Sequence, residues 1–337
     1  MSSATRAWDT SPPRRYPGGL VVLAVLLTLP AGAATILRLV PPRDDATALL
    51  ASFIPYGIVG SLLALLVLLV ALIRARRRRI LAVLTAGVAA LSTLQLSWLG
   101  PFFVADGPPA AGATFTVLSL NLYNGAADPD QIRDQAFRVD VVVLVETTPA
   151  VLEVLATSQW RERFPYAVGD PESEQSNTTV YSRFPLSDGQ VIGPTSFEQW
   201  ITAVRVPELG EVRLAAVHPC NPYCGGGRWA REHEERRRAI RPYLADPLVI
   251  AGDFNAIDDH GPMLDLHADG LRSAADLAGA GWMPTFPANR AYPPIFPIDH
   301  ILVSERLTAT EIDTVRVAGT DHLGLVATIG RRSGSGP

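Results

Sequence analysis

The sequence of 337 residues predicts membrane-spanning helices followed by a separate domain built on β-strands. Three apolar stretches precede residue 105, and each is long enough to cross a hydrocarbon core of roughly 30 Å. Beyond them, short apolar runs typical of buried strands end in Asn, Glu, His or Asp. We therefore divide the chain into a membrane anchor at 1–104, a linker at 105–113, a domain at 114–330 and a disordered tail at 331–337.

The apolar stretches run from Leu20 to about Val40, from Ala46 to Ile73 and from Ile80 to about Val104. Each contains a proline, which membrane helices tolerate better than soluble ones do. The first stretch has a second interpretation as a secretory signal, because Arg14 and Arg15 precede it and Ala31-Gly32-Ala33 resembles a cleavage site. The two later spans would anchor the chain in either case.

Arginine placement predicts the orientation of these spans. Basic residues precede the first span and separate the second from the third, namely Arg6, Arg14, Arg15, Arg74 and Arg76 to Arg79. In the other connection, Arg43 is offset by Asp44 and Asp45, and no arginine follows the third span until Arg133. The positive-inside rule predicts a multi-pass cell-membrane protein with a cytoplasmic N-terminus and an extracytoplasmic domain. The linker reaches at most about 35 Å, so this domain must work close to the bilayer.

Polar side chains follow the apolar runs of the domain at the points where the runs end. Asn121 follows Phe115 to Leu120, Glu146 follows Val141 to Val145, His218 follows Val212 to Val217, and Asp253-Phe254-Asn255 follows Leu248 to Gly252. Asp299-His300 opens another run, and Thr320-Asp321-His322 precedes the last. Residues i and i+2 of a strand share a face, so Asp253 and Asn255 project together if strand geometry holds. Carboxylates bind hard cations and histidine transfers protons near neutral pH, so the set indicates a hydrolytic metal site.

These motifs, in this order from about Thr114 to Ile329, resemble the endonuclease/exonuclease/phosphatase superfamily of divalent-metal phosphoesterases. The resemblance implies an α/β fold, a two-sheet β-sandwich flanked by helices, with the site at the edge where strand ends of both sheets converge. Val145 stands where many members have Gln, and Gly324 stands where Pro is usual. Neither departure removes a group that performs chemistry.

The resemblance also implies a bound Mg²⁺, with Mn²⁺ as the alternative. Glu146 is the expected principal ligand, assisted by the side-chain oxygen of Asn121. Asp321 would bind the metal or form hydrogen bonds within the site.

The same resemblance implies how water would be activated. His322 is the expected general base, with Asp299 holding its other ring nitrogen. Asp253 would orient or deprotonate the attacking water, so the choice of base between Asp253 and His322 stays open.

Substrate contacts are expected from three further residues. His218 and Asn221 would contact phosphate, with His218 also assisting the leaving group, and Asn255 would hold the water or a phosphoryl oxygen.

Of the remaining histidines, His300 is interpreted as structural and His233 as a surface residue. His260 and His267 are either substrate contacts or structural residues.

Charge argues against a long polyanion as substrate. The chain contains no Lys, and from residue 111 onward it carries 19 Arg against 29 acidic residues, a net charge of −10. Proteins that grip nucleic acid usually show the opposite balance. A helix-like stretch interleaves six arginines with Glu232, Glu234 and Glu235, and we interpret it as a solvated, salt-bridged face; the arginines are Arg228, Arg231, Arg236, Arg237, Arg238 and Arg241.

Cys220 and Cys224 are the two cysteines of the chain. Their spacing is not that of a zinc site or of the usual redox pair. An exported domain favours a disulfide that stiffens the loop after His218, and buried free thiols are the alternative.

These features predict a membrane-anchored, Mg²⁺-dependent phosphoesterase that acts outside the cytoplasm on a lipid-borne phosphate. Three spans followed by this domain also resemble the bacterial membrane phosphatases linked to teicoplanin resistance, which implies undecaprenyl pyrophosphate as substrate. The alternatives are an anchored nuclease, a sphingomyelinase-like phosphodiesterase and a catalytically silent scaffold. The expected partners are the bilayer and a phosphorylated lipid or other phosphoester, with nucleic acid less favoured and no obligate protein partner evident. The apolar loop 290–297 either rests against lipid or forms a packed connection.

Overall fold

The computed structural model describes residues 17–75, 78–169 and 177–334, which form two compact units. The first unit contains residues up to Leu39 and Phe53–Trp98, and the second contains Val40–Ser52 together with the chain from Leu99 onward. Of the arginines that predict the orientation, Arg6, Arg14, Arg15, Arg76 and Arg77 lie outside the described residues, as do positions 335–337 of the expected tail.

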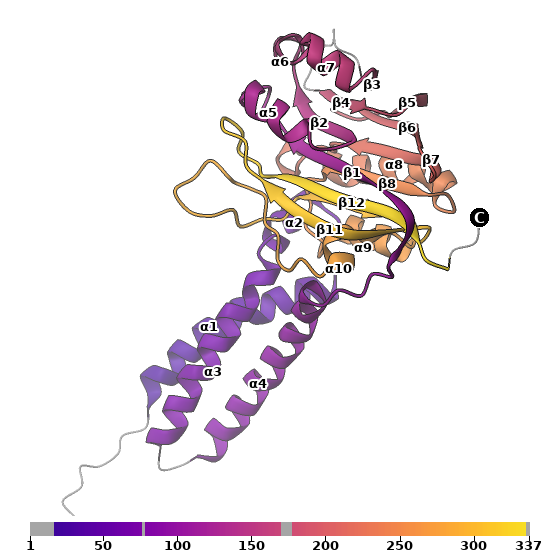
Figure 1. Ribbon diagram of the computed structural model, residues 1–337. Coiled ribbons are helices and arrows are strands. Elements are labelled where there is room, and N and C mark those ends of the chain that lie inside the picture. The colour runs from indigo at the N-terminus through magenta and orange to yellow at the C-terminus, as the bar shows by residue number, and fades with distance from the viewer. Residues whose placement is uncertain (1–16, 76–77, 170–176, 335–337) are drawn as a thin grey trace, which may run out of the picture. The chain divides into compact units, whose positions relative to one another are not determined.

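Three long helices make up the first unit: α1 (Gly18–Leu39), α3 (Gly57–Arg74) and α4 (Arg79–Leu99) (Figure 1). A buried polar network joins all three, because Gln95 accepts a hydrogen bond from Ser61 and donates to the carbonyl oxygen of Ala31 and the hydroxyl of Thr35. Ala31 is fully buried within continuous helix, so the cleavage-like segment is part of this packing. The helices at Gly18–Leu39, Asp45–Arg74 and Arg79–Phe103 are long and apolar enough to cross a membrane, as predicted.

The second apolar stretch is less uniform than predicted, because it is interrupted near Pro55. The short helix α2 (Asp45–Ala51) comes first, then a 3₁₀ turn, η1 (Ile54–Tyr56), and only then α3. Proline lacks an N–H donor and disfavours helical backbone in the residue before it, which explains the break. The 18 residues of α3 rise about 27 Å, close to the thickness of a hydrocarbon core.

Two six-stranded mixed sheets form the centre of the second unit. The first sheet has the order β11-β12-β1-β2-β4-β3, and the second has the order β5-β6-β7-β8-β10-β9. Among the strands of the described residues, β1–β2 and β7–β8 are the parallel pairs, and the other pairs are antiparallel. The first-sheet strands are β1 (Ala110–Asn121), β2 (Val141–Thr147), β3 (Tyr166–Val168), β4 (Asn177–Ser182), β11 (Leu307–Val315) and β12 (Gly324–Arg332). The second-sheet strands are β5 (Leu186–Ile192), β6 (Gln199–Val206), β7 (Gly210–Val217), β8 (Leu248–Asp253), β9 (Arg272–Ser273) and β10 (Asp299–Val303).

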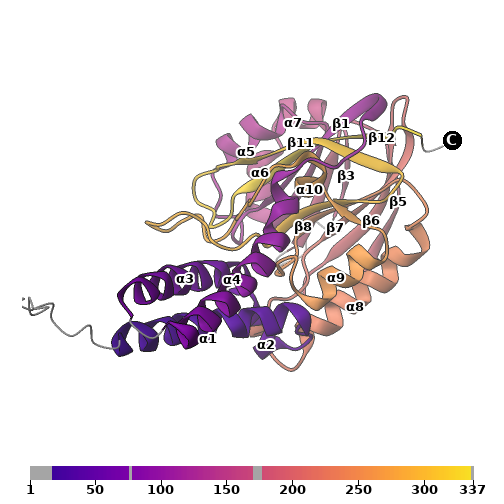
Figure 2. The same ribbon diagram turned by 90° about the horizontal axis from the view of Figure 1, so that it is seen from below.

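Helices cover the outer faces of both sheets, as Figure 2 shows. Along β2, Val141 and Val143 pack between the sheets, whereas Val142 and Leu144 pack outward against helices. Burial on both faces explains why the run is uninterrupted in the sequence rather than alternating. The helices are α5 (Pro129–Ala136), α6 (Pro149–Leu155) and α7 (Ser158–Arg163) on the first sheet, and α8 (Arg228–Ile240) and α9 (Gly261–Ala268) on the second, with α10 (Ala274–Ala278) beside β11. The predicted two-sheet fold is confirmed.

Strand pairing extends this domain beyond the expected bounds. Ala110 of β1 pairs with Arg332 of β12, so the strands reach into the segments assigned to the linker and the tail. Gly107 also donates a backbone hydrogen bond to Leu277. The segment between the last apolar helix and the domain is therefore partly fixed to the domain.

The arginine-rich stretch now seen as helix α8 was interpreted from the sequence as a solvated, salt-bridged face. This interpretation was wrong for the side of the helix that is buried. Trp229, Glu232, His233, Arg236 and Ile240 are all buried. Their spacing of three or four residues forms one stripe that packs on the second sheet. Arg238, by contrast, forms the expected surface ion pairs with Glu234 and Glu235. His233 is consequently a core residue rather than a surface one.

Candidate active site

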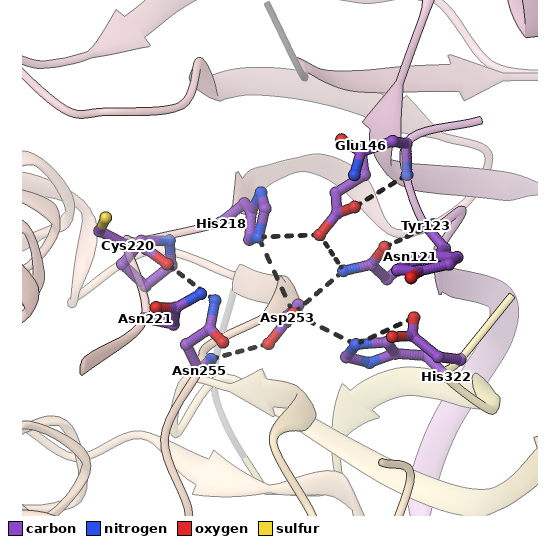
Figure 3. A network of polar contacts seen from close by, with 12 residues as sticks. Asn121, Tyr123, Glu146, His218, Cys220, Asn221, Asp253, Asn255 and His322 are labelled. Atoms are coloured by element: carbon purple, nitrogen blue, oxygen red, sulfur yellow. Dashed lines mark hydrogen bonds and ion pairs between the residues drawn. The ribbon is translucent and has the colours of Figure 1, made fainter. Parts of the chain in front are cut away.

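Strand topology brings the predicted polar residues to one edge of the two sheets. Because β1 and β2 are parallel, Asn121 and Glu146 lie at the same end of the first sheet. The parallel strands β7 and β8 do the same for His218 and Asp253 in the second sheet. Asp299 begins the antiparallel strand β10 directly opposite Asp253. Glu146, Asn121, His218 and His322 surround Asp253 (Figure 3).

Glu146 projects from a β-bulge. The register of β2 against β4 shifts between Val145 and Thr147, and Glu146 has a positive φ of 58°. Bulges re-aim side chains, and such strained backbone is concentrated at functional sites. The carboxylate accepts hydrogen bonds from the Asn121 side chain at 3.0 Å and from the Asn124 backbone at 2.8 Å.

Asn121 presents its amide nitrogen to the carboxylates. Its Nδ2 donates to Glu146 Oε1 and to Asp253 Oδ2, both at 3.0 Å, while its Oδ1 accepts from the backbone of Tyr123. The sequence suggested that the side-chain oxygen binds metal, and in this arrangement that oxygen faces away. Ligation by Asn121 would require the amide to rotate and exchange the two positions.

Asp253 lies at the centre of the site and is almost fully buried. Burial, together with the nearby Asp299 and Glu146 charges, raises its pKa to about 7, against the opposing effect of His322. The preceding Gly252 has no room for a side chain, because an added Cβ would lie 1.9 Å from the carbonyl oxygen of Val217. This glycine lets β8 deliver Asp253 close to β7.

Asp299 and His322 form a buried hydrogen-bonded pair, with His322 Nδ1 2.7 Å from Asp299 Oδ2. Although burial opposes it, the charges of Asp299 and Asp253 raise the pKa of His322 to about 10. The pair directs His322 Nε2 toward Asp253 Oδ2, 3.7 Å away, and toward Asp321 Oδ1, 3.9 Å away. Burial raises the pKa of the half-buried Asp321 as well.

His218 approaches Asp253 from the other side. Its Nε2 lies 3.8 Å from Asp253 Oδ2 and 3.7 Å from Glu146 Oε1. Burial lowers the pKa of His218 to about 4, so this imidazole is neutral where that of His322 is charged. The ring of Phe197 stacks on it with centroids 4.5 Å apart.

Asn255 reaches the site through a turn rather than by strand alternation. Strand β8 ends at Asp253, and Asn255 has a positive φ of 48°. Its N–H donates to Asp253 Oδ1 at 2.7 Å, and its side-chain amide donates to the carbonyl oxygen of Pro219. This contact joins the loop after β8 to the loop after β7.

Asn221 lies in that second loop, where its side chain caps the turn η3 (Pro222–Cys224) by accepting from the N–H of Tyr223. A disulfide joins Cys220 and Cys224 around this turn, which is the pairing that the sequence favoured.

The donor set fits a divalent cation. Two groups of ligand atoms, each within 4.8 Å, share Asp253: Glu146 and His218 complete one, and Asp299 and His322 complete the other. Among the described residues, Asp299 Oδ1 is buried without a hydrogen-bond partner. Mg²⁺ commonly takes one or two carboxylates and fills its remaining positions with water and phosphate oxygens. Glu146 and Asp253 can supply such a pair, with Asp321 nearby.

The other histidines do not point into the site. His260 is buried, with Nε2 2.9 Å from the carbonyl oxygen of Ala48 and Nδ1 accepting from Ile257. His300 contacts the carbonyl oxygen of Ala256, and His267 pairs with Asp258. All three are packing residues in this structure.

Sequence reasoning missed three residues that support the site. Phe197 stacks on His218, and Phe286 packs against His322 with centroids 4.9 Å apart. Buried Glu232 of α8 accepts backbone hydrogen bonds from Ser196 and Cys220, which holds the segments on both sides of His218. Each lies far along the chain from its partner, so no local pattern could have identified it.

Comparison with known proteins identifies the family to which this chain belongs. Residues 118–322 match the model of the Endonuclease/Exonuclease/phosphatase family. An endonuclease/exonuclease/phosphatase family protein from Bacteroides thetaiotaomicron is 15% identical, with a TM-score of 0.51 over 64% of this chain and 98% of that one. The structure of D. rerio TDP2 complexed with single strand DNA product is 14% identical, with a TM-score of 0.51 over 65% of this chain and 100% of that one. No curated protein matches the sequence. At these identities the solved structures support the fold alone.

Proposed function

Because the chain belongs to the endonuclease/exonuclease/phosphatase family, we propose that it is a membrane-anchored, metal-dependent phosphoesterase that hydrolyses a lipid-borne phosphate such as undecaprenyl pyrophosphate. The observation that carries this proposal is the convergence of Glu146, His218 and the Asp299–His322 pair on Asp253. A hydrolase of phosphoesters needs groups that bind phosphate, orient water and accept its proton, and this convergence supplies each of them.

Water activation belongs to Asp253, His322 and Asp299 as one unit. Asp299 accepts from Nδ1 of His322, which leaves Nε2 facing Asp253. The 3.7 Å between Nε2 and Asp253 Oδ2 is longer than a hydrogen bond, so each atom remains available to a water molecule. In hydrolysis the water oxygen bonds to phosphorus, the bond to the leaving oxygen breaks, and the unit takes the water's proton. Strongly coupled groups share such a proton, so we assign it to the unit rather than to one residue.

Phosphate positioning falls to residues on the opposite side of Asp253. His218 is neutral and presents Nε2, so it can hydrogen-bond a phosphoryl oxygen without competing for the proton. Asn221 and Asn255 lie on two loops joined by the Asn255–Pro219 hydrogen bond. A divalent cation held by Glu146 and Asp253 would neutralise phosphate charge and lower the pKa of water.

Several features favour a lipid substrate outside the cytoplasm. Three apolar helices precede the domain, and the net charge of −10 from residue 111 onward disfavours a long polyanion. Residues Val40–Ser52, between the first two apolar helices, belong to the same unit as the site. Two of the three apolar helices separate this segment from the domain in the sequence, and two crossings would return the chain to the same side of the membrane. With the arginine pattern, this supports an extracytoplasmic site.

The test is phosphate release from undecaprenyl pyrophosphate by the full chain in detergent with Mg²⁺, with plasmid DNA in a parallel reaction. We expect release from the lipid and intact DNA. Asp253→Asn should abolish release, and the matched control Glu311→Gln should retain it, because Glu311 is an exposed residue of β11 outside the site.

Three results would overturn parts of this proposal. DNA nicking without lipid turnover would replace the lipid substrate with nucleic acid, and release of a phosphorylated headgroup from phospholipid would make the enzyme a phosphodiesterase. Wild-type rates in Asp253→Asn would refute the mechanism itself.

A further inference from the structure

The segment between the first two apolar helices is built into the unit that carries the active site. Ala48 of α2 is fully buried in the core cluster that also contains Trp229, Phe254 and Met263. Arg43, just before α2, forms a two-pronged ion pair with Asp265 of α9, at 2.6 and 2.8 Å. The ion pair lies at the surface, whereas the burial of Ala48 is what distinguishes this segment from a solvated connection between two spans. The segment Val40–Ser52, here called the clamp segment, is therefore a packed part of this domain.

One group of contacts leads from the clamp segment to the loop that carries Asn255. His260 Nδ1 accepts from the backbone of Ile257, so its Nε2 is the donor and bonds to the carbonyl oxygen of Ala48. Trp229, whose ring lies edge-on to His260, donates from Nε1 to the carbonyl oxygen of Asn255. His260 therefore links Ala48 of helix α2 to the loop that carries Asn255, and Trp229 contacts both His260 and Asn255.

A second contact leads to the loop that carries Asn221. Asp45 Oδ2 accepts a hydrogen bond from the N–H of Gly227 at 2.9 Å. Gly227 ends the run of three glycines after Cys224 and caps the start of α8. All three glycines have positive φ, and an added Cβ at Gly225 or Gly226 would meet no atom within 4 Å. Arg228 and Arg231 of α8 hydrogen-bond carbonyl oxygens of the run, so its other restraints come from the helix that follows it. Asp45 supplies an anchor at the far end of the run.

We propose that Asp45 is a positioning residue and that the clamp segment holds the two substrate loops, 219–227 and 254–260, in register with Asp253. The inference deepens the proposed function, since it concerns substrate binding at that same site. It makes the connection between the first two membrane helices a part of the catalytic domain. The two loops carry Asn221 and Asn255, which the proposed function assigns to phosphate contacts, so loss of their order is expected to weaken substrate binding more than the chemical step.

The experiment compares Asp45→Ala, Asp45→Asn and Leu50→Ala in the full chain. Asp45→Ala removes the acceptor for Gly227, Asp45→Asn restores one through its amide oxygen, and Leu50 is an exposed residue of the same helix. Three measurements are made on each variant: steady-state kinetics (kcat and KM) of phosphate release from undecaprenyl pyrophosphate, backbone hydrogen exchange of residues 219–227, and the melting temperature.

Asp45→Ala is expected to raise KM about tenfold with kcat changed less than about threefold, and to speed exchange in 219–227. Asp45→Asn should recover most of both effects, and Leu50→Ala should match wild type. A merely structural role would lower the melting temperature without this division between KM and kcat. Unchanged KM and unchanged exchange in Asp45→Ala would overturn the inference. If the wild type releases no phosphate, the proposed function fails, and the exchange comparison still decides the role of Asp45.

Discussion

Two Asp–His pairs in the second unit, one buried and one half-buried, have similarly raised histidine pKa values but differ in what they can do. His322 Nδ1 lies 2.7 Å from Asp299, and His267 Nε2 lies 3.2 Å from Asp258. Burial opposes protonation in both, yet the carboxylate partners raise the pKa of His322 to about 10 and that of His267 to about 9.

The surroundings of the two pairs separate them. His322 keeps Nε2 directed at Asp253, and Glu146 and His218 converge on the same carboxylate. His267 has no comparable nitrogen to offer, since its Nδ1 is 3.0 Å from the carbonyl oxygen of Leu271. A perturbed pKa therefore does not identify a site by itself; an available ring nitrogen and converging carboxylates do. Four experiments test this distinction.

The largest effect is expected from metal removal. Chelation by EDTA should lower phosphate release by more than about a thousandfold, because the carboxylates around Asp253 then repel the phosphate without a compensating cation. Added Mg²⁺ should restore the rate. Glu146→Gln should require about 10–100 times more Mg²⁺ for half-maximal rate, whereas Asp258→Asn should follow the wild-type curve. Full activity in EDTA would contradict metal dependence.

The second-largest effect is expected from removing the carboxylate charge of each pair, because kcat should fall at one pair and not at the other. Asp299→Asn should lower kcat by about 10³–10⁴, because the amide no longer fixes the tautomer of His322 or stabilises its charge. Asp258→Asn is expected to leave kcat within about twofold. Equal losses in the two variants would show that the pairs share a function.

The Asp258–His267 pair is expected to affect the stability of the fold rather than kcat. Its folded pKa is raised from 6.5 to about 9, so it stabilises the fold fully below pH 6.5 and loses that contribution as pH rises toward 9. One pKa unit corresponds to about 1.4 kcal/mol, so the shift sets a ceiling of roughly 3 kcal/mol. Thermal unfolding at pH 6 and pH 9 should show a larger drop for wild type than for His267→Gln. The same drop in melting temperature in both proteins would show that the pair does not contribute to this pH dependence.

The smallest effect is expected where Phe286 packs on His322. Phe286→Leu removes the ring contact but keeps an apolar side chain, and kcat should fall by roughly two- to tenfold, since such aromatic contacts contribute about 0.5–1.5 kcal/mol. Phe296→Leu, at the residue that forms an isolated β-bridge with Phe286, is the matched control and should change kcat less. A larger loss in the control would show that the loop, rather than the ring contact, supports His322.

Much of the site was predictable because its signals are local. An apolar run ending in Asn121, Glu146, His218 or Asp253 predicts a strand end, and short parallel pairs bring such ends to one edge. The two-sheet fold was implied by the family resemblance that these motifs carry, and the Cys220–Cys224 disulfide was expected from the spacing together with the predicted export of the domain. Orientation at the atomic level was not predictable, as the Asn121 amide and the turn at Asn255 illustrate. Both depend on hydrogen bonds to residues distant in the sequence or on backbone that departs from strand geometry.

The sequence by itself determined three apolar helices, a strand-rich domain and the polar residues that converge on Asp253, because hydropathy and strand ends are properties of neighbouring residues. Only the tertiary structure decided which side chains of α8 are buried and that Glu232 holds the segments around His218. It also decided that Val40–Ser52, apolar enough to be counted partly as membrane span, packs into the catalytic domain. The physical reason is the same in each case. Burial of Ala48 or Glu232 depends on partners about two hundred residues away or on another element of the fold, and no local pattern encodes them.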